Sequence, residues 1–491
     1  MRLKTLATAA AGLTLALGTV ACNDDLTGIN VSPNAPSSTD PQLLFPDGVT
    51  ASVGRIRGAN FDLTFSALWA QFYAKIQYVD EDWYQIRPAT IDTHWSQLYA
   101  GPLKNFQVAA QVATEEGKPE MAAPAIIMRN WTVGVMTDVW GDIPFTEALQ
   151  ASTENPSFLP AYDPQEVVYD SILTSLASSA AALEGLASNG YGNADVIYGG
   201  DAAKWRKFAN SLRARYGMRL SKVNPERARA EVEAALAAGV MESNADNAVL
   251  VWPGDGVNNS PYYDNFLGRD DHRLSKTMVD TLSGRNDPRL AVYAMPTQDD
   301  PTKYVGIPNG LSNVEAAKLG LSKTSRPGEF FSKATSPSYL MTYSEVLFIK
   351  AEAAARGWAV PGGTAKSFYD AGVVASFEQF GVPSASAAAA TYLAQPSVAT
   401  ASLENIALQK WIALFGQGTE GWAEWRRTGV PVLTPAVQAR TASKGVARRL
   451  AYPSSEQSLN NASLQAAIAG QGGVQNTTIN GRVWWDTGAV P

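Results

Sequence analysis

The stretch "WRKFANSLRARYGMRLSKVNPERARAEVEAALAAG", residues 205–239, decides the fold class. Its first part predicts a helix with one apolar face, because apolar residues recur at steps of three and four: Trp205, Phe208, Leu212, Tyr216 and Leu220. A second helix follows at once, since Asn224 can cap its start, Pro225 suits its first position and Gly239 suits its end. Two helices joined by a tight turn predict a helical hairpin.

The same pattern recurs nearer the C-terminus, in residues 338–358 and 364–381. The first of these segments places six residues on one helical face: Leu340, Tyr343, Leu347, Ala351, Ala354 and Trp358. Hairpins of this kind bury their apolar faces only against their neighbours, as tetratricopeptide repeats do. Further helices are predicted over 95–117, 119–140, 163–186, 274–284 and 402–427. The sequence therefore predicts a fold dominated by α-helices, built as a tetratricopeptide-like scaffold.

Residues 240–338 interrupt this scaffold and, apart from the helix predicted over 274–284, are irregular, without a helical or strand period. Gly, Pro, Asn and aromatic residues are mixed there. A long irregular insertion in a compact domain usually serves function. We therefore expect this segment to carry a ligand-binding surface.

Composition excludes several classes of protein. The chain has 491 residues with one cysteine, Cys22, and two histidines, His94 and His272. The single cysteine rules out an internal disulfide and a thiolate metal cluster. The two histidines disfavour a histidine-rich metal site. The net charge of −7 disfavours a nucleic-acid partner, because phosphate binding usually needs a basic face.

The N-terminus has the pattern of a bacterial leader. Arg2 and Lys4 precede an apolar run at 6–17, which is too short to span a bilayer but fits a signal peptide of residues 1–21. The lone Cys22 after Val20 and Ala21 resembles the lipobox of bacterial lipoproteins, in which the thiol is lipidated after cleavage. The alternative is an ordinary secreted protein, cut near Ala21, with a free thiol.

A tether and one large domain follow the lipidation site. Residues 22–42 are rich in Pro, Ser, Asn and Asp and show no apolar period, which predicts a flexible tether. No second linker of this kind occurs in residues 43–491. We therefore expect residues 43–491 to form a single domain.

Several motifs, taken in their order along the chain, resemble the SusD/RagB family of surface lipoproteins, and within it the SusD-like branch. They are "VMTDVWGDIPFTEAL" at 135–149, "DPQEVVYDSILTSL" at 163–176, "AKWRKFANSLRARYGMRL" at 203–220, "YSEVLFIKAEAAARG" at 343–357, "WAEWRRTGVP" at 422–431 and "RRLAYPSSEQSLN" at 448–460. The resemblance extends from the lipobox almost to the end of the chain.

This resemblance implies a lipid-anchored protein on the outer face of the outer membrane. It implies a SusC-like TonB-dependent barrel as partner, over which the lipoprotein sits as a lid that delivers captured oligomeric nutrients. The ligands of the family are most often glycans, and some members bind oligopeptides. The turn residues and arginines of the motifs themselves, such as Asp142, Glu147, Arg426 and Arg449, are expected to be structural.

The ligand-binding candidates lie outside the predicted helices. An aromatic side chain beside amides and carboxylates suits a sugar, whose ring has apolar C–H faces and a rim of hydroxyls. On this basis we predict a site made of Tyr78, Trp83 and Tyr84 in one loop, with Trp252, Asn259, Tyr262 and Tyr263 in the insertion. No catalytic residue, resident metal or cofactor is predicted, and Ca²⁺ binding by the acid-rich stretch 78–82 stays open.

Two other functions compete with nutrient binding. Helical glycoside hydrolases exist, and 46 acidic residues would allow a catalytic carboxylate pair. No nucleophile elbow, phosphate loop or metal-binding helix motif is present, so the sequence predicts a protein that is not an enzyme. A purely structural scaffold would bind a protein partner but no small ligand.

Overall fold

The computed structural model describes residues 40–150 and 157–488. From Pro41 onward the chain forms one compact unit. The predicted leader at 1–21, Cys22 and most of the predicted tether at 22–42 lie outside the described residues. At the end of that tether the chain is already helical, because helix α2 begins at Pro41.

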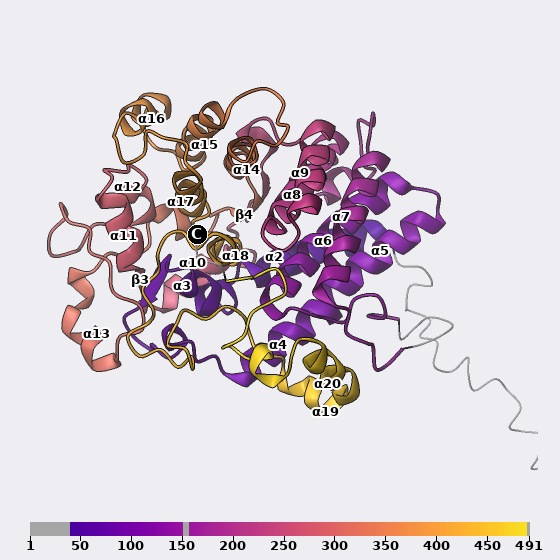
Figure 1. Cartoon of the computed structure of the whole chain (residues 1–491), viewed down its shortest axis with the longest axis horizontal. Coiled ribbons are helices and arrows are strands. Elements are labelled where there is room, and N and C mark those ends of the chain that lie inside the picture. Colours follow the sequence, from indigo (N-terminus) through magenta and orange to yellow (C-terminus); the bar gives the residue numbers. More distant parts are fainter. Residues whose placement is uncertain (1–39, 151–156, 489–491) are drawn as a thin grey trace, which may run out of the picture. The chain divides into compact units, whose positions relative to one another are not determined.

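A first group of long helices packs in sequence order, each against the next, as Figure 1 shows. After α2, Pro41–Ile56, this group consists of α5, Lys104–Glu115; α6, Pro119–Trp140; α7, Gln165–Ala182; α8, Ala202–Arg219; and α9, Pro225–Ala238. The hairpin of α8 and α9 confirms the prediction from residues 205–239. The side chain of Asn224 accepts a hydrogen bond from the backbone N–H of Arg227, and Gly239 ends the helix at φ 95°.

A second group continues the scaffold from helix α14, which contacts α8. It consists of α14, Tyr343–Ala355; α15, Ala365–Gln379; α16, Ala385–Leu393; α17, Leu403–Ala413; and α18, Gly418–Thr428. The tight pairing of α14 with α15 confirms the second predicted hairpin. At Gly372 a side chain would collide with the ring of Phe348, so the glycine permits the close approach of the two helices.

The predicted boundaries are wrong at both ends of α14. Leu340 belongs to strand β4, Ser338–Met341, and the helix starts after Thr342, whose side chain accepts a hydrogen bond from the backbone N–H of Glu345. Trp358 lies beyond the helix end. The single helix predicted over 402–427 is two helices, because the chain turns at Gly416 with φ 84°.

The insertion is more regular than predicted. It contains β2, Ala248–Leu250; α10, Pro261–Gly268; β3, His272–Leu274; α11, Lys276–Ser283; α12, Leu290–Tyr293; and α13, Asn313–Leu319. Strand β2 pairs with β4, and β3 pairs with β1, Tyr73–Lys75, both in antiparallel fashion. Within the described residues, the remaining α-helices are α3, Ala67–Trp69; α4, Pro88–Leu98; α19, Ser454–Leu459; and α20, Asn461–Gly470.

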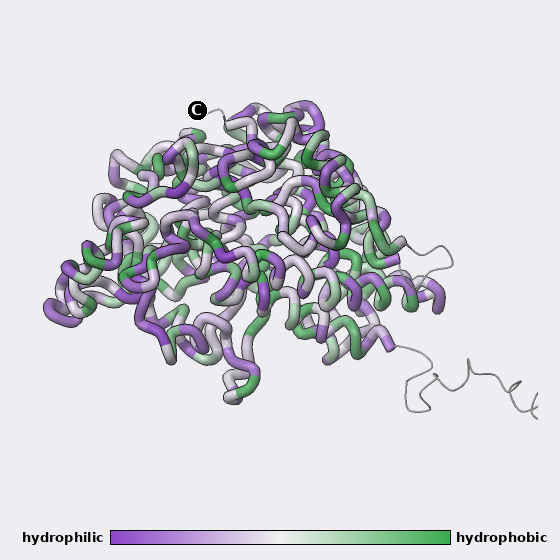
Figure 2. Tube along the Cα trace, turned by 90° about the horizontal axis from the view of Figure 1, so that it is seen from below, coloured by the Kyte–Doolittle hydropathy of each residue, from purple (hydrophilic) through white to green (hydrophobic). Residues whose placement is uncertain are grey.

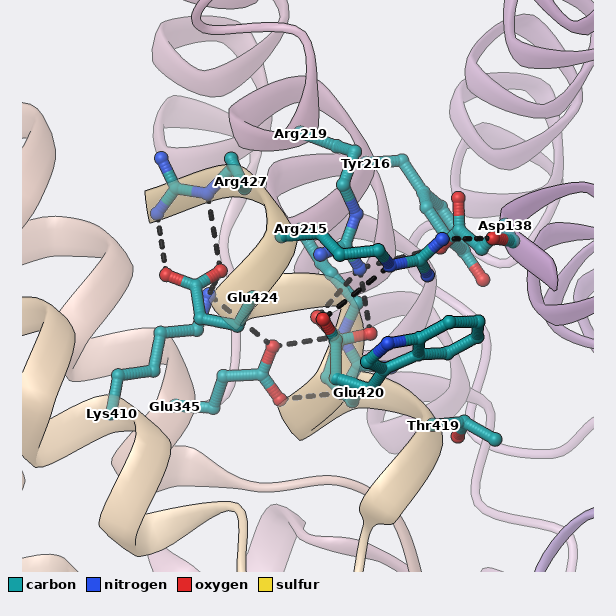
Figure 3. A network of polar contacts seen from close by, with 12 residues as sticks. Asp138, Arg215, Tyr216, Arg219, Glu345, Lys410, Thr419, Glu420, Glu424 and Arg427 are labelled. Carbon is teal, nitrogen blue, oxygen red and sulfur yellow. Dashed lines mark hydrogen bonds and ion pairs between the residues drawn. The ribbon is translucent and has the colours of Figure 1, made fainter. Parts of the chain in front are cut away.

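Buried ion pairs join the two helix groups (Figure 3). Arg215 of α8 binds Glu345 of α14 at 2.8 Å. Within the second group, Arg427 of α18 binds Glu352 of α14 at 2.7 Å. The same network includes Asp138, Arg219, Lys410, Glu420 and Glu424, all of which are buried. Charged side chains that are buried in the protein interior stay ionised only when they are paired. The network therefore favours one arrangement of the helices relative to each other.

The motif residues are structural, as predicted. Arg426 donates to the backbone carbonyl oxygens of Asp138 at 2.6 Å and Arg448 at 2.8 Å, and Arg449 donates to that of Trp140. Asp142 accepts a hydrogen bond from the backbone N–H of Gln165 at 2.9 Å. These contacts tie the C-terminal segment to the end of α6.

Apolar and polar stretches alternate along the trace in Figure 2. None of the helices in the described ranges combines the length and the apolar character that a membrane-crossing segment needs.

Candidate functional site

The pairing of β1 with β3 brings the two predicted ligand-binding segments together. Lys75 lies opposite His272, and the backbone N–H of Ile76 donates to the carbonyl oxygen of Asp271 at 2.8 Å. The loop after β1 therefore runs beside the residues that precede β3. As a result Tyr78 lies next to Arg269, with 5.0 Å between the guanidinium carbon and the ring centroid.

A cleft of about 520 Å³ lies beside this contact. That volume is within the range of small-molecule sites. We call it the Tyr263 cleft, and its lining residues come from α10, β3 and the segments near 295 and 326–332: Tyr263, Phe266, Leu267, Gly268, Arg269, Asp270, His272, Met295, Arg326, Pro327 and Ser332.

The rim of the Tyr263 cleft is apolar and open to solvent. Leu267 and Met295 are exposed, and Tyr78, beside the cleft, is 64% exposed. Tyr78 has a positive φ of 53°, a conformation uncommon for a residue with a side chain. An exposed aromatic ring held against a guanidinium offers a flat apolar face to a ligand.

Charged groups line the same cleft, and they are paired. Asp270 receives hydrogen bonds from Arg273 and Arg326, each at 2.8 Å. Burial alone would raise the pKa of Asp270, but the bonds from these two guanidinium groups outweigh it and lower the pKa. Arg269 binds Asp271 at 3.0 Å. These guanidinium and carboxylate groups can therefore form hydrogen bonds with a polar ligand.

His272 is the buried end of the Tyr263 cleft. Burial, together with the nearby Lys75 ammonium, lowers its pKa to about 4, so the imidazole is neutral near pH 7. Its Nε2 lies 3.0 Å from the carbonyl oxygen of Leu63, which can only accept, so Nε2 carries the proton. Nδ1 is then an acceptor, and within the described residues it has no hydrogen-bond partner.

This arrangement suits binding better than hydrolysis. A glycoside hydrolase needs two carboxyl groups flanking the bond, one of them with a raised pKa so that it can act as the acid. The carboxyl group that lines the Tyr263 cleft, Asp270, has a lowered pKa and is tied to two arginines.

The acid-rich stretch 78–82 is used internally. Glu81 pairs with Lys75 at 3.0 Å, and Asp82 accepts backbone N–H groups of Lys75 and Gly310, each at 3.0 Å. Over residues 40–150 and 157–488, no group of three or more His, Cys, Asp or Glu is placed to hold a metal ion.

Four of the seven predicted ligand residues do not lie on the Tyr263 cleft because they pack inside the domain. Tyr84, 4% exposed, accepts from the backbone N–H of Ala436, and Tyr262, 6% exposed, donates to Asp62 at 2.8 Å. Trp83 is half-buried and donates to the carbonyl oxygen of Leu311 at 2.9 Å. Trp252, also buried, donates to Ser338 at 2.9 Å. We therefore leave Tyr84, Tyr262 and Trp83 out of the proposed ligand surface.

The other three predicted residues divide between two places. Tyr263 lines the cleft that bears its name, and Tyr78 extends it. Asn259 donates a hydrogen bond to Asp264 at 3.0 Å. Asp264 lies on another side of α10, where it lines a second cleft together with Trp252. The prediction that the ligand-binding candidates lie outside the helices is wrong for Tyr262 and Tyr263, since both lie in α10.

Sequence reasoning missed the polar half of the cleft. Arg269, Asp270 and His272 come from the run "RDDHR" at 269–273, and Arg326 follows 53 residues later than its last member. The density of opposite charges in that run was a usable signal. The sequence carries no such signal for Phe266 and Met295, because their position at the cleft depends on how the chain folds between α10 and α12.

A family whose description is "Starch-binding associating with outer membrane", named SusD-like, matches residues 33–453. The chain belongs to the SusD-like family. This result confirms the resemblance found in the motifs and the tetratricopeptide-like helical fold.

Solved SusD-like structures are similar over nearly the whole chain. A chitin-binding protein is 29% identical with a TM-score of 0.81, covering 91% of this chain and 100% of that one. A chitin-binding SusD homologue from Flavobacterium johnsoniae is 28% identical with a TM-score of 0.79, covering 91% and 99%. A SusD homologue from Bacteroides thetaiotaomicron is 26% identical with a TM-score of 0.77, covering 92% and 100%. No curated protein matches this SusD-like chain in sequence.

Proposed function

We propose that this SusD-like protein binds oligosaccharides in the Tyr263 cleft and does not modify them. The observation that carries the proposal is the exposed ring of Tyr78, held over Arg269 beside a cleft that combines an apolar rim with paired charges. A sugar ring can place its C–H face on the aromatic side chain and its hydroxyl groups on the guanidinium and carboxylate groups. The family description and the chitin-binding relatives support this ligand class.

Chitin and starch oligosaccharides are therefore the first ligands to test, with oligopeptides as the rival class. Tyr78→Ala and Tyr263→Ala are each expected to weaken binding of the oligosaccharide about thirtyfold, since a stacked aromatic commonly contributes about 2 kcal/mol. Titration calorimetry of the purified mature protein in detergent measures the affinity.

Tyr84→Phe is the matched control, because this ring is buried and away from the Tyr263 cleft. It should leave the affinity unchanged. Wild-type affinity in both alanine variants would refute this site, and tight binding of peptides with no binding of saccharides would refute the ligand class.

We further propose that Cys22 carries lipid and anchors the protein to the outer membrane, facing the cell surface. The lipobox-like sequence before Cys22 supports this, and acyl chains contribute roughly 0.8 kcal/mol per buried CH₂. Cys22→Ser is expected to move the protein from the membrane to the soluble fraction, measured by fractionation of cells that lack the partner barrel. Retention of the variant in outer membranes would contradict the anchor.

The proposed partner is a SusC-like TonB-dependent barrel that receives the captured ligand. Membership in a family described as associating with the outer membrane supports this. We expect the barrel to co-purify from native membranes in mild detergent, through an interface above roughly 1,000 Å². Recovery of this protein alone and in full yield, with the barrel expressed, would count against the partnership.

A further inference from the structure

A second cleft, of about 580 Å³, lies on another side of α10 from the Tyr263 cleft. We call it the Trp252 cleft. It lies among the C-terminal part of α2, helix α4 and the segment that leads into α10, and its lining residues are Thr50, Ala51, Gly54, Arg55, Gly58, Ala59, Asn60, His94, Trp252, Pro261, Asp264 and Asn265.

The two clefts share no lining residue, and the helical period of α10 separates them. Pro261, Asp264 and Asn265 recur at steps of three and one, which places them together on one face. Tyr263, Phe266 and Leu267 follow the same spacing two residues later and line the other cleft. Different side chains of α10 therefore line the two clefts.

Trp252 supplies a fixed aromatic surface to its cleft. The ring is 8% exposed, and its Nε1 donates to Ser338 at 2.9 Å, which sets its orientation. A Cβ at Gly54 would come within 3.3 Å of the ring, so the glycine leaves room beside it. The tryptophan is thus held by the protein on one side and lines the cleft on the other.

Two buried polar atoms at this cleft have no hydrogen-bond partner among the described residues: His94 Nδ1 and Asn265 Nδ2. His94 is 2% exposed, and its Nε2 lies 2.7 Å from the carbonyl oxygen of Asn60, so the proton is on Nε2 and Nδ1 accepts. Burial lowers the pKa of His94 to about 4, in agreement with a neutral imidazole. The amide Nδ2 of Asn265 can only donate.

An unpaired acceptor and an unpaired donor in one cleft call for a group that can both donate and accept, and a hydroxyl does both. Arg55 and Asp264 add a cation and an anion to the lining. We propose that the Trp252 cleft is a second saccharide-binding site, in which a ring lies against Trp252 and a hydroxyl bridges His94 and Asn265. The proposal rests on the proposed function for its ligand class, and adds a separate site.

The test is the number of chitobiose or maltose molecules bound per chain, measured by titration calorimetry of the mature protein. Two sites are expected in the wild type, and Tyr263→Ala should leave the second in place. Asn265→Leu should weaken that second site about fivefold through the lost hydrogen bond, and Trp252→Ala about thirtyfold. Asn461→Leu, an exposed change on α20, is the matched control and should change neither site.

The outcomes separate this inference from the proposed function. A single site that Tyr263→Ala abolishes, with Asn265→Leu binding as the wild type does, overturns the second site and leaves the first intact. No saccharide bound by the wild type overturns both. A folded Asn265→Leu protein with one of two sites weakened supports the inference even if Trp252→Ala does not fold.

Discussion

Replacing Arg427 with methionine is expected to lower the free energy of unfolding by about 3–5 kcal/mol, because it removes the cation that two buried carboxylates share. Arg427 binds Glu352 and Glu424, and all three side chains are buried. Figure 3 shows the pair of Arg427 with Glu424. Burial would raise the pKa of Glu424, but Arg427 and Lys410 outweigh it and keep the pKa low. Without Arg427 this balance is lost.

Urea denaturation of the two proteins measures the difference. Arg229→Met is the matched control, since Arg229 is exposed and pairs with Glu233 one turn along α9. Its loss should change stability by less than about 1 kcal/mol. Equal stability of the two variants would show that the buried pairs of Arg427 do not contribute to the stability of the domain.

Trp205→Ala is expected to cost about 3–5 kcal/mol of folding stability. Trp205 is fully buried, packs against Phe45, Tyr198 and Phe208, and donates to Asp195 at 2.6 Å. The substitution removes a large ring from the core of the first helix group and leaves a cavity there.

Trp205→Phe keeps most of the ring volume and should cost clearly less, whereas the exposed Tyr78→Ala should stay within about 0.5 kcal/mol of the wild type. Thermal or urea unfolding of the three variants checks this order. A Trp205→Ala protein as stable as Tyr78→Ala would mean that residues 205–239 do not form the core that the fold requires.

The helical scaffold could be predicted from local sequence signals. Asn224, Pro225 and Gly239 fixed the ends of α9 because capping depends on residues a few positions apart. The same reasoning failed at Leu340, whose strand exists only because β2 pairs with it from about ninety residues away. A helical spacing of apolar residues cannot show that pairing.

The site was predictable only in part, for the same physical reason. The exposed Tyr78 and the half-buried Tyr263 were predicted from their aromatic character. The neighbouring Tyr262 instead points inward, because its hydroxyl donates a hydrogen bond to Asp62, 200 residues earlier in the chain. Arg269 and Tyr78 meet because β1 and β3 pair across the chain. Which aromatic side chains reach the surface thus depends on long-range contacts and not on the local sequence.

The most direct test of the central claim is a crystal structure of the protein with a bound chitin or starch oligosaccharide. We predict a sugar ring in the Tyr263 cleft, with its apolar face against Tyr78 or Tyr263 and its hydroxyl groups within hydrogen-bonding distance of Arg269, Asp270 or Arg326. An oligosaccharide bound elsewhere on the domain, with the Tyr263 cleft free of sugar, would contradict the account.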